Sequence, residues 1–426
     1  MNATPFFNML SPASKEAVLK IRPGNFSSNA KYALGMVKAL SSKQIAQIEF
    51  PECIFRGGNC GSIEDFASFK EQEKKTREKF LKDVKKIKNA PKIVFTKTTA
   101  EDVLLSRVNS NERLPFCGSP EMVFEKQIIG LARRLLAINC KKDVLGLSGW
   151  LDSTLALLVI YETFKLLKFD LKNISVYTMP GFGTTKRTKG NADALCAALG
   201  IDIKTVNITP ACKQHFSDIG HNTKNHDITY ENTQARERTQ ILMDTANMVG
   251  GIVIGTGDMS EIALGWSTYN GDHMSMFAVN SGVPKTVVQE ICSWYAMRAE
   301  EDDKKLSKTL FDIVATPISP VLLPANGNKI LQKTEERVGP YELHDFFMWH
   351  LIGEKKSSKQ VLKEAKKVFK KIYSVATIKK WLDVFIHRFF TQSFKRNCAP
   401  DGIKIFNIYF GPFDFYIPSD IFTQKM

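Results

Sequence analysis

The segment 144–157 carries the residue types that bind phosphate. It begins with an apolar run of β-forming residues, passes through a Ser/Gly loop, and continues as an apolar helical pattern with Asp152 and Ser153 in its first turn. Unpaired backbone N–H groups at the start of a helix, together with the positive end of its dipole, favour a bound phosphate. The spacing predicts an anion-binding loop, and a purely structural strand-turn-helix unit is the alternative.

A second polar segment, 230–238, opens a predicted helix. Asn232 and Arg236 lie near one face of that helix, and its arginines could grip phosphates or a carboxylate in fork geometry. Ion pairs with Glu231 and Glu237 on the helix surface are the alternative.

A third segment, 255–273, is dense in polar and small residues directly after a buried apolar run, where a structural loop rarely needs so many. Glu261 in this segment and Asp152 could together hold Mg²⁺ against phosphate oxygens, because hard cations take carboxylate and phosphate ligands. We assign no role to His273. A Gly/Thr-rich loop at 179–185 follows another predicted strand and is as compatible with a flexible turn as with a binding loop.

The elements that must position these segments alternate along the chain between 142 and 288. We predict strands at 144–147, 174–179, 203–208 and 251–255, with helices at 152–168, 187–199 and 231–249. This alternation predicts an α/β fold with a doubly wound parallel sheet. Ligands bind such a sheet beyond the carboxyl ends of its strands, where all of these segments fall.

The chain divides into four sections. Residues 1–100 show only an α-β-α-β pattern, with helices at 29–37 and 71–88 and strands at 45–50 and 92–96, so this α/β section is small and incomplete. A linker at 101–120 leads to a section at 121–304, which opens on an amphipathic helix at 122–136 after the capping residues Ser119, Pro120 and Glu121. Residues 305–426 form a lysine-rich, mostly helical C-terminal extension.

The composition of the 426 residues is that of a globular protein, with a formal net charge of +15. Much of the excess charge lies in the lysine-rich stretches 82–88 and 363–371. Both have the spacing of amphipathic helices, so we read them as solvated faces and expect no nucleic-acid partner. A nucleic-acid surface, or a field that favours a polyanionic small substrate, is the alternative.

The pattern of apolar residues and cysteines limits where in the cell the protein is expected. No apolar run is long enough to span a membrane, and the first residues lack the pattern of a secretory signal. The eight cysteines are scattered without metal-ligand spacing, which fits reduced thiols. We therefore expect a cytoplasmic protein with no membrane partner.

The phosphate-binding segment resembles the pyrophosphate loop of ATP pyrophosphatases, whose pattern is Ser-Gly-Gly-x-Asp-Ser. The pattern is kept except at Trp150, where that family has its second glycine. A glycine lets backbone amides approach a phosphate, whereas an indole would occupy the same space.

The region from about 116 to 420 resembles the synthetase domain of the glutamine-dependent NAD⁺ synthetase family. The matching stretches are 179–185, 232–243, 255–274, 284–286, 316–320, 338–347 and 394–398. The resemblance implies a Rossmann-like ATP pyrophosphatase fold. It also implies a reaction in which ATP adenylates the nicotinate carboxylate of deamido-NAD⁺ and ammonia then displaces AMP. ATP, Mg²⁺, deamido-NAD⁺ and ammonia are the implied cofactors and substrates, and we expect a homodimer or a larger homo-oligomer.

The resemblance assigns roles residue by residue. The residues that would bind ATP are Gly146, Leu147, Ser148, Gly149, Trp150, Leu151, Asp152, Ser153 and Thr256. The residues that would bind deamido-NAD⁺ are Asn232, Glu261, Trp266, Ser267, Thr268, Tyr269 and Lys395. Asp152 and Glu261 would hold the metal and act in catalysis.

Residues 1–100 resemble the opening third of a nitrilase-type glutaminase domain at Asn29–Ala30, Phe50–Pro51–Glu52, Cys60–Gly61 and Asp65–Phe66. That likeness gives Glu52 the role of general base in a Glu-Lys-Cys triad. The chain jumps past the region where the family's lysine and cysteine would lie, so we read Glu52 as vestigial and expect ammonia rather than glutamine as the nitrogen donor.

Two hypotheses follow. The first is an NAD⁺ synthetase-type ligase fed by free ammonia. The second is a catalytically impaired paralogue that retains dinucleotide binding. Trp150, the truncated glutaminase section and the loss of two arginines near 411–420 favour the second hypothesis, and the otherwise intact site favours the first. A basic nucleic-acid binder is a third possibility, which salt-sensitive binding would reveal.

Overall fold

The computed structural model describes residues 113–116, 119–316, 338–406 and 408–411. The sequence predictions for the first 112 residues, including Glu52 and the incomplete α/β section, lie outside the described residues. So do most of the stretch at 316–320 and the tail at 412–420.

Five parallel strands form the central sheet, in the order β3-β2-β1-β4-β5. Their bounds are β1 Asp143–Gly146, β2 Ile174–Thr178, β3 Ile203–Thr205, β4 Ile252–Gly255 and β5 Phe277–Ala278. The chain adds β2 and β3 on one side of β1 and then crosses to add β4 and β5 on the other. The order therefore reverses between β1 and β4, which is where a doubly wound sheet opens a crevice. The α/β fold with a doubly wound parallel sheet is confirmed.

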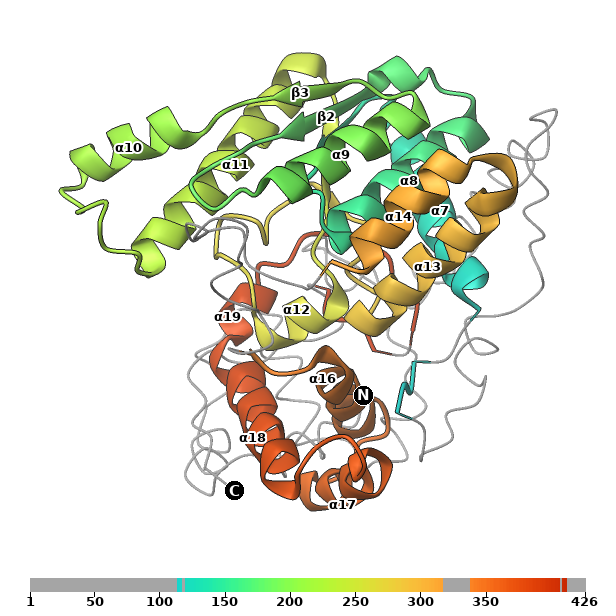
Figure 1. The fold of residues 1–426 in the computed structure, drawn as a ribbon, viewed down its shortest axis with the longest axis vertical. Helices are drawn as coiled ribbons and strands as arrows, with labels where there is room; N and C mark the ends of the chain where they lie inside the picture. The colour runs from blue at the N-terminus through green and yellow to red at the C-terminus, as the bar shows by residue number, and fades with distance from the viewer. Residues whose placement is uncertain (1–112, 117–118, 317–337, 407, 412–426) are drawn as a thin grey trace, which may run out of the picture.

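Helices cover both faces of the sheet (Figure 1). One face carries α7 Pro120–Ala137, α8 Leu151–Leu167, α9 Lys186–Leu199, α13 Lys285–Asp302 and α14 Lys304–Val314. The other face carries α11 Ile228–Val249, with α10 Thr209–Asp218 packed beside it, and a short 3-10 helix, η3 Leu171–Asn173, leads into β2. The helices predicted at 122–136, 152–168, 187–199 and 231–249 are present. The helix predicted from 231 begins three residues earlier, because the Asp227 carboxylate caps the amides of Thr229 and Tyr230 at 2.9 and 3.1 Å.

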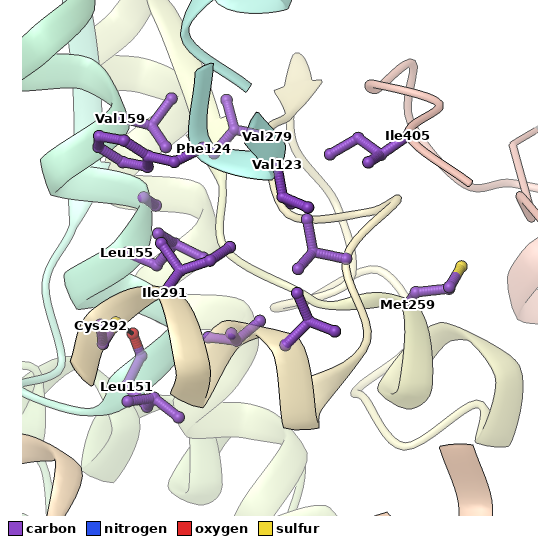
Figure 2. Packing of buried hydrophobic residues seen from close by; sticks show 14 of the residues in the cluster. Val123, Phe124, Leu151, Leu155, Val159, Met259, Val279, Ile291, Cys292 and Ile405 are labelled. Atoms are coloured by element: carbon purple, nitrogen blue, oxygen red, sulfur yellow. Dashed lines mark hydrogen bonds between the residues drawn. The ribbon is translucent and has the colours of Figure 1, made fainter. Parts of the chain in front are cut away.

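Alternate side chains of the strands enter two hydrophobic cores. Leu145 of β1 and Ile254 of β4 belong to the larger core, while their neighbours Val144 and Val253 belong to a smaller core under α11. Such alternation is expected for a sheet with helices on both faces. The larger core includes side chains of α7, α8 and α13, and Figure 2 shows part of it around Leu155.

The C-terminal part is helical, as predicted, and lies against a short helix, α12 Met259–Leu264. Its elements are α16 Tyr341–Met348, the π-helical turn η4 Trp349–Gly353, α17 Ser358–Phe369, α18 Val375–Thr391 and α19 Ser393–Arg396. Figure 1 shows α12 between these helices and the α/β layers, and α12 packs against α16, α18 and α19. The larger core runs without a break from the sheet into these helices.

Two composition-based expectations can be compared with the described residues. Along α17, Val361, Ala365 and Phe369 are buried while Lys363 and Lys367 are exposed, so this lysine-rich stretch is an amphipathic helix. In the part of the chain that the structure describes, no helix combines the length and the apolar character needed to cross a bilayer.

Candidate active site

The loops that follow β1 and β4 meet at the point where the strand order reverses and line a cavity of about 1040 Å³. Every residue predicted to bind ATP lines it except Gly149, and every residue predicted to bind deamido-NAD⁺ lines it. The segments at 144–157, 230–238 and 255–273 are thus brought together, as the sequence predicted.

Gly149 does not line the cavity because it lies against α9. Its φ is +78°, and a Cβ at this position would lie 1.9 Å from the Thr188 carbonyl oxygen, so only glycine fits. Hydroxyl groups close the rest of the loop. The Ser148 amide donates to Ser153 Oγ at 3.2 Å, and Ser153 Oγ donates to the Trp150 carbonyl at 3.1 Å.

Trp150 is the N-cap of α8, where it supplies no side-chain oxygen to the first amides of the helix. Ser, Thr, Asp or Asn in this position would satisfy one of those amides, whereas tryptophan leaves them for another acceptor. The Trp150 side chain is half-buried and lines the cavity, and its Nε1 is buried with no hydrogen-bond partner among the described residues. The indole of Trp150 therefore lies beside the phosphate loop, at the position where the Ser-Gly-Gly-x-Asp-Ser pattern has its second glycine.

Three carboxylates and one ammonium form a cluster beside this loop. The Nζ of Lys285 lies 2.6 Å from Asp152 Oδ2, 2.6 Å from Asp258 Oδ2 and 3.0 Å from Glu261 Oε1. Lys285 is 2% exposed. We call these four residues the Lys285 cage. Asp152 and Glu261 were predicted to lie together, and the structure adds Asp258 and the lysine to them.

Local structure fixes each member of the Lys285 cage. Asp258 is the N-cap of α12, and its Oδ1 accepts from the amides of Ser260 and Glu261 at 2.8 and 2.9 Å, which leaves Oδ2 for the lysine. Lys285 begins α13, and its amide donates to Ser260 Oγ at 2.9 Å. Ser260 Oγ in turn donates to the buried Asp345 of α16.

Burial and charge shift the pKa values in the cage. Burial is the main cause that raises the pKa of Asp258, to about 7, with Lys285 opposing and Asp152 adding to the rise. Burial likewise raises the pKa of Glu261 well above its ordinary value against the pull of Lys285. Burial alone would lower the pKa of Lys285, but the attraction of the three carboxylates exceeds it, so this pKa lies well above its ordinary value.

The Lys285 cage suits a divalent cation. When all three carboxylates are ionised, they exceed the single ammonium by two negative charges, and oxygens of the three carboxylates lie within 4.8 Å of one another. Asp152 Oδ1 is buried and has no hydrogen-bond partner within the described ranges. Hard oxygen ligands with excess negative charge are the donor set that Mg²⁺ prefers.

The opposite side of the cavity joins α11 to the loop after α12. Thr268 Oγ1 donates to Asn232 Oδ1 at 2.9 Å, and Arg236 Nε donates to the Tyr269 carbonyl at 3.3 Å. The Tyr269 ring stacks on His273, with centroids 5.2 Å apart. Arg236 is exposed outside the cavity lining, whereas Arg238 lines the cavity and donates to the Met179 carbonyl at 3.0 Å.

Three cations of α18 and α19 hold the C-terminal end of α12. Lys395 Nζ donates to the carbonyls of Gly265 and Ser267 at 2.8 and 2.6 Å. Arg388 Nε donates to the Leu264 carbonyl at 3.0 Å, and Arg396 NH1 donates to the Ala263 carbonyl at 2.8 Å. Cations at a helix C-terminus are favoured by its dipole. Two of the three Lys395 protons are thus bonded within the protein, and the Arg388 guanidinium lies 5.1 Å from the centre of the Trp266 ring.

Sequence reasoning gave no role to Asp258, Lys285 or Arg388, whereas Arg238 was among the arginines predicted to grip phosphates or a carboxylate. One signal could have identified Lys285. It is the first residue of a helix, where the dipole disfavours a cation, so a lysine there indicates nearby carboxylates. Asp258 carries a capping signature with Glu261 three residues later, but nothing in the sequence says that its second oxygen would face a lysine.

The sheet order and the loop at its reversal define a Rossmann-like α/β protein. Residues 123–382 match the NAD synthase family model. A glutamine-dependent NAD(+) synthetase of Mycobacterium leprae is 37% identical over 327 residues, which cover 69% of this chain and 48% of that protein. One from Thermotoga maritima is 30% identical over 294 residues, which cover 68% of this chain and 46% of that protein.

A solved structure resembles this fold as well. It is a glutamine-dependent NAD(+) synthetase from Cytophaga hutchinsonii, with a TM-score of 0.57 and 19% identity over 71% of this chain and 54% of that chain. The chain belongs to the NAD synthase family, and the resemblance proposed from its motifs is confirmed. It spans about half the length of the curated relatives it matches.

Proposed function

We propose that this protein is an ATP-dependent ligase that converts deamido-NAD⁺ to NAD⁺ with ammonia, releasing AMP and pyrophosphate. The observation that carries the proposal is the single cavity that joins the loop at 146–153, the Lys285 cage and the aromatic side at 266–269. Family membership supports the same reaction class.

The reaction needs two substrates held end to end. The nicotinate carboxylate of deamido-NAD⁺ attacks the α-phosphorus of ATP, pyrophosphate leaves, and the carboxylate becomes an acyl adenylate. Ammonia then attacks the acyl carbon, AMP leaves with the electron pair of the broken C–O bond, and the nitrogen loses a proton. A carboxylate is a poor electrophile, so the mixed anhydride supplies the leaving group that it lacks.

The loop at 146–153 and Thr256 would hold the ATP phosphates. The first amides of α8 have no side-chain cap from Trp150, so they would donate to a phosphate bound at the N-terminus of this helix. Asp152, Asp258 and Glu261 would hold Mg²⁺, which supplies positive charge to the phosphate oxygens when bound. The buried ammonium of Lys285 adds a second positive charge beside the same loop.

The loop at 266–269, Asn232 and Lys395 would hold deamido-NAD⁺. The Trp266 and Tyr269 rings offer faces for the nicotinate or the adenine, and the hydrogen bond from Thr268 to Asn232 fixes the loop against α11. Glu261 lies on the short helix α12 and lines the cavity between Thr256 and the loop at 266–269, so it would face both substrates. Positioning and charge would then account for most of the catalysis.

The second candidate function is dinucleotide binding without turnover, and Trp150 is the observation that favours it. The half-buried indole lines the cavity at the phosphate loop. In this case the loop at 266–269 would still bind deamido-NAD⁺, but ATP would bind only weakly in the position that the reaction requires.

An AMP-release assay separates the two functions. The protein is incubated with ATP, Mg²⁺ and deamido-NAD⁺, with ammonium or glutamine as the nitrogen donor. We expect AMP only when deamido-NAD⁺ is present, and no more product from glutamine than from ammonium. The variant Asp152→Asn is the control, since it should lose this AMP. Binding of deamido-NAD⁺ without AMP would support the impaired paralogue, and a clear preference for glutamine would show that the glutaminase section works.

A further inference from the structure

Asn280 links the two loops that follow β1 and β4. It lies just after β5 and is completely buried. Its Nδ2 donates one hydrogen bond to the Asp152 carbonyl at 2.9 Å and one to the Thr256 carbonyl at 3.0 Å. The two protons of a single side-chain amide are therefore donated to two segments that are far apart in the sequence.

Gln127 of α7 fixes the orientation of this amide. Gln127 Nε2 donates to Asn280 Oδ1 at 2.9 Å and to the Val279 carbonyl at 3.0 Å, and Gln127 is also completely buried. If the Asn280 amide were rotated by half a turn, its oxygen would face two carbonyls and its NH₂ would face another NH₂. The observed arrangement is therefore the one in which each of these close contacts pairs a donor with an acceptor.

The sheet itself does not hold the two loops at this separation. Strands β1 and β4 pair only at Asp143 with Ile252 and at Val144 with Val253, which is at the amino-terminal end of β1. Beyond these two pairs, β1 and β4 continue to the cavity without further paired residues between them. The Asn280 bonds lie on the far side of this unpaired stretch, where the loops line the cavity.

We propose that Asn280 is a positioning residue that sets the separation of the two phosphate-binding loops, oriented for this by Gln127. The inference rests on the proposed function, because it takes the loops at 146–153 and 256 to grip one triphosphate. Donors that grip a ligand from two sides bind it well only when their spacing is fixed beforehand, since otherwise binding must supply the ordering. Asn280 has no place in the cavity lining, so it acts through the two loops.

The test compares Asn280→Ser, Asn280→Asp and Ser281→Ala with the parent. A serine hydroxyl can donate only one of the two hydrogen bonds, and aspartate keeps the acceptor for Gln127 but donates neither. Ser281 is the matched control: it is buried next in the chain, and its hydroxyl donates to the Ala278 carbonyl at 3.0 Å instead of to either loop. For each protein we would measure hydrogen exchange of the amides at 147–153 and 255–258 without nucleotide. We would then measure the Kd for ATP and the KM for each substrate.

We expect faster exchange in both loops for the two Asn280 variants. We also expect the Kd and KM for ATP to rise about tenfold in Asn280→Ser and further in Asn280→Asp, from the loss of one or two hydrogen bonds. The KM for deamido-NAD⁺ should change less than about twofold, because a loss of overall stability would not select one substrate. Ser281→Ala should match the parent. If Asn280→Asp does not fold, Asn280→Ser decides.

The inference and the proposed function can fail separately. Unchanged loop exchange and unchanged ATP binding in folded Asn280→Ser would overturn the positioning role, whatever the reaction. Equal increases in the KM of both substrates would also overturn it. A parent that binds no ATP, combined with looser loops in Asn280→Ser, would overturn the proposed function and keep the structural link.

Discussion

Two regions of the molecule each hold a lysine ammonium between carboxylates. One is the Lys285 cage in the cavity. The other, the Lys356 cage, lies in the C-terminal helices, where Lys356 Nζ is 2.7 Å from both Glu354 Oε2 and Glu364 Oε2. His350 Nδ1 completes it at 2.6 Å from Glu354 Oε2. The contact distances of the two clusters are alike.

Burial and charge balance separate the two cages. The side chain of Lys285 is 3% exposed and faces three carboxylates, whereas that of Lys356 is 23% exposed and faces two. Burial raises the pKa of Asp258 and of Glu261. In the Lys356 cage burial also acts to raise the pKa of Glu354, but its hydrogen bonds from Lys356 and His350 exceed this, and the pKa is lowered.

This difference shows that the Lys285 cage, and not the Lys356 cage, lowers the stability of the folded protein. The ions of the Lys356 cage are partly exposed to solvent, as those of a structural ion-pair cluster commonly are. The Lys285 cage carries excess negative charge whenever its three carboxylates ionise, and holding that charge around a buried ammonium costs folding free energy unless another cation shares it. Shifted pKa values of this kind gather at functional sites, which agrees with the role that we propose for the cavity.

The largest effect is expected from removing the lysine of the cavity. Lys285→Met leaves the buried Asp258 and the partly buried Asp152 and Glu261 without their ammonium, so we expect a loss of about 3 kcal/mol in the free energy of unfolding and no measurable turnover. The loss should shrink as pH falls, because the carboxylates then take up protons in the folded state. Urea unfolding at several pH values measures it. A stability equal to that of the parent at pH 8 would contradict the charge balance of the Lys285 cage.

The next effect is expected at the phosphate loop. Trp150→Gly removes the indole that lines the cavity and keeps an acceptable N-cap, so ATP affinity should rise about tenfold. A titration of ATP into both proteins measures this. If the parent already binds ATP as tightly as the variant, the indole does not obstruct the phosphates.

A third prediction concerns pH. The pKa of Asp258 is about 7 in the folded protein, above its ordinary value of 3.8, so the folded state binds the extra proton between these values. The stability that this group contributes is therefore full below about pH 4 and lost as pH rises towards 7. Asp258→Asn keeps the cap on α12, and its free energy of unfolding should fall less than that of the parent between about pH 4 and pH 7. Parallel profiles for parent and variant would show that another group titrates.

The smallest effect is expected in the Lys356 cage. Lys356→Met is the control for Lys285→Met, and we expect a loss below about 1 kcal/mol with unchanged turnover, because partly exposed ion pairs contribute little. Unfolding curves and the AMP assay check both. A loss as large as that of Lys285→Met would erase the contrast between the two cages.

The sequence predicted the fold wherever local patterns suffice. Strands β1, β2 and β4 coincide with runs rich in apolar, β-forming residues, β3 is the short Ile-Lys-Thr stretch within the predicted 203–208, and the alternation of strands with helices predicts the doubly wound sheet. Strand β5 has only two residues inside a polar segment, so no pattern reveals it. The short helix α10 was missed for a related reason, since only Cys212 and Phe216 of its residues are buried.

The candidate site was predicted in part. Asp152 and Glu261 were paired because hard cations take carboxylate ligands, and both fall in segments expected beyond the carboxyl ends of the strands. Lys285, Arg388 and Asn280 reach the site through tertiary packing from α13, α18 and the turn after β5. Their neighbours are remote in sequence, so composition and spacing carry no sign of Arg388 or Asn280, and only the position of Lys285 at the start of a helix points to that residue. The roles assigned to the lining residues remain predictions.

The most direct test of the account is a crystal structure of the protein with Mg²⁺, deamido-NAD⁺ and an ATP analogue whose α–β bridge cannot be cleaved. The account predicts the triphosphate along 146–153 with the metal at Asp152 and Glu261, and the nicotinate between Trp266 and Asn232. Phosphates bound away from this loop, with the indole of Trp150 still in their place, would contradict it.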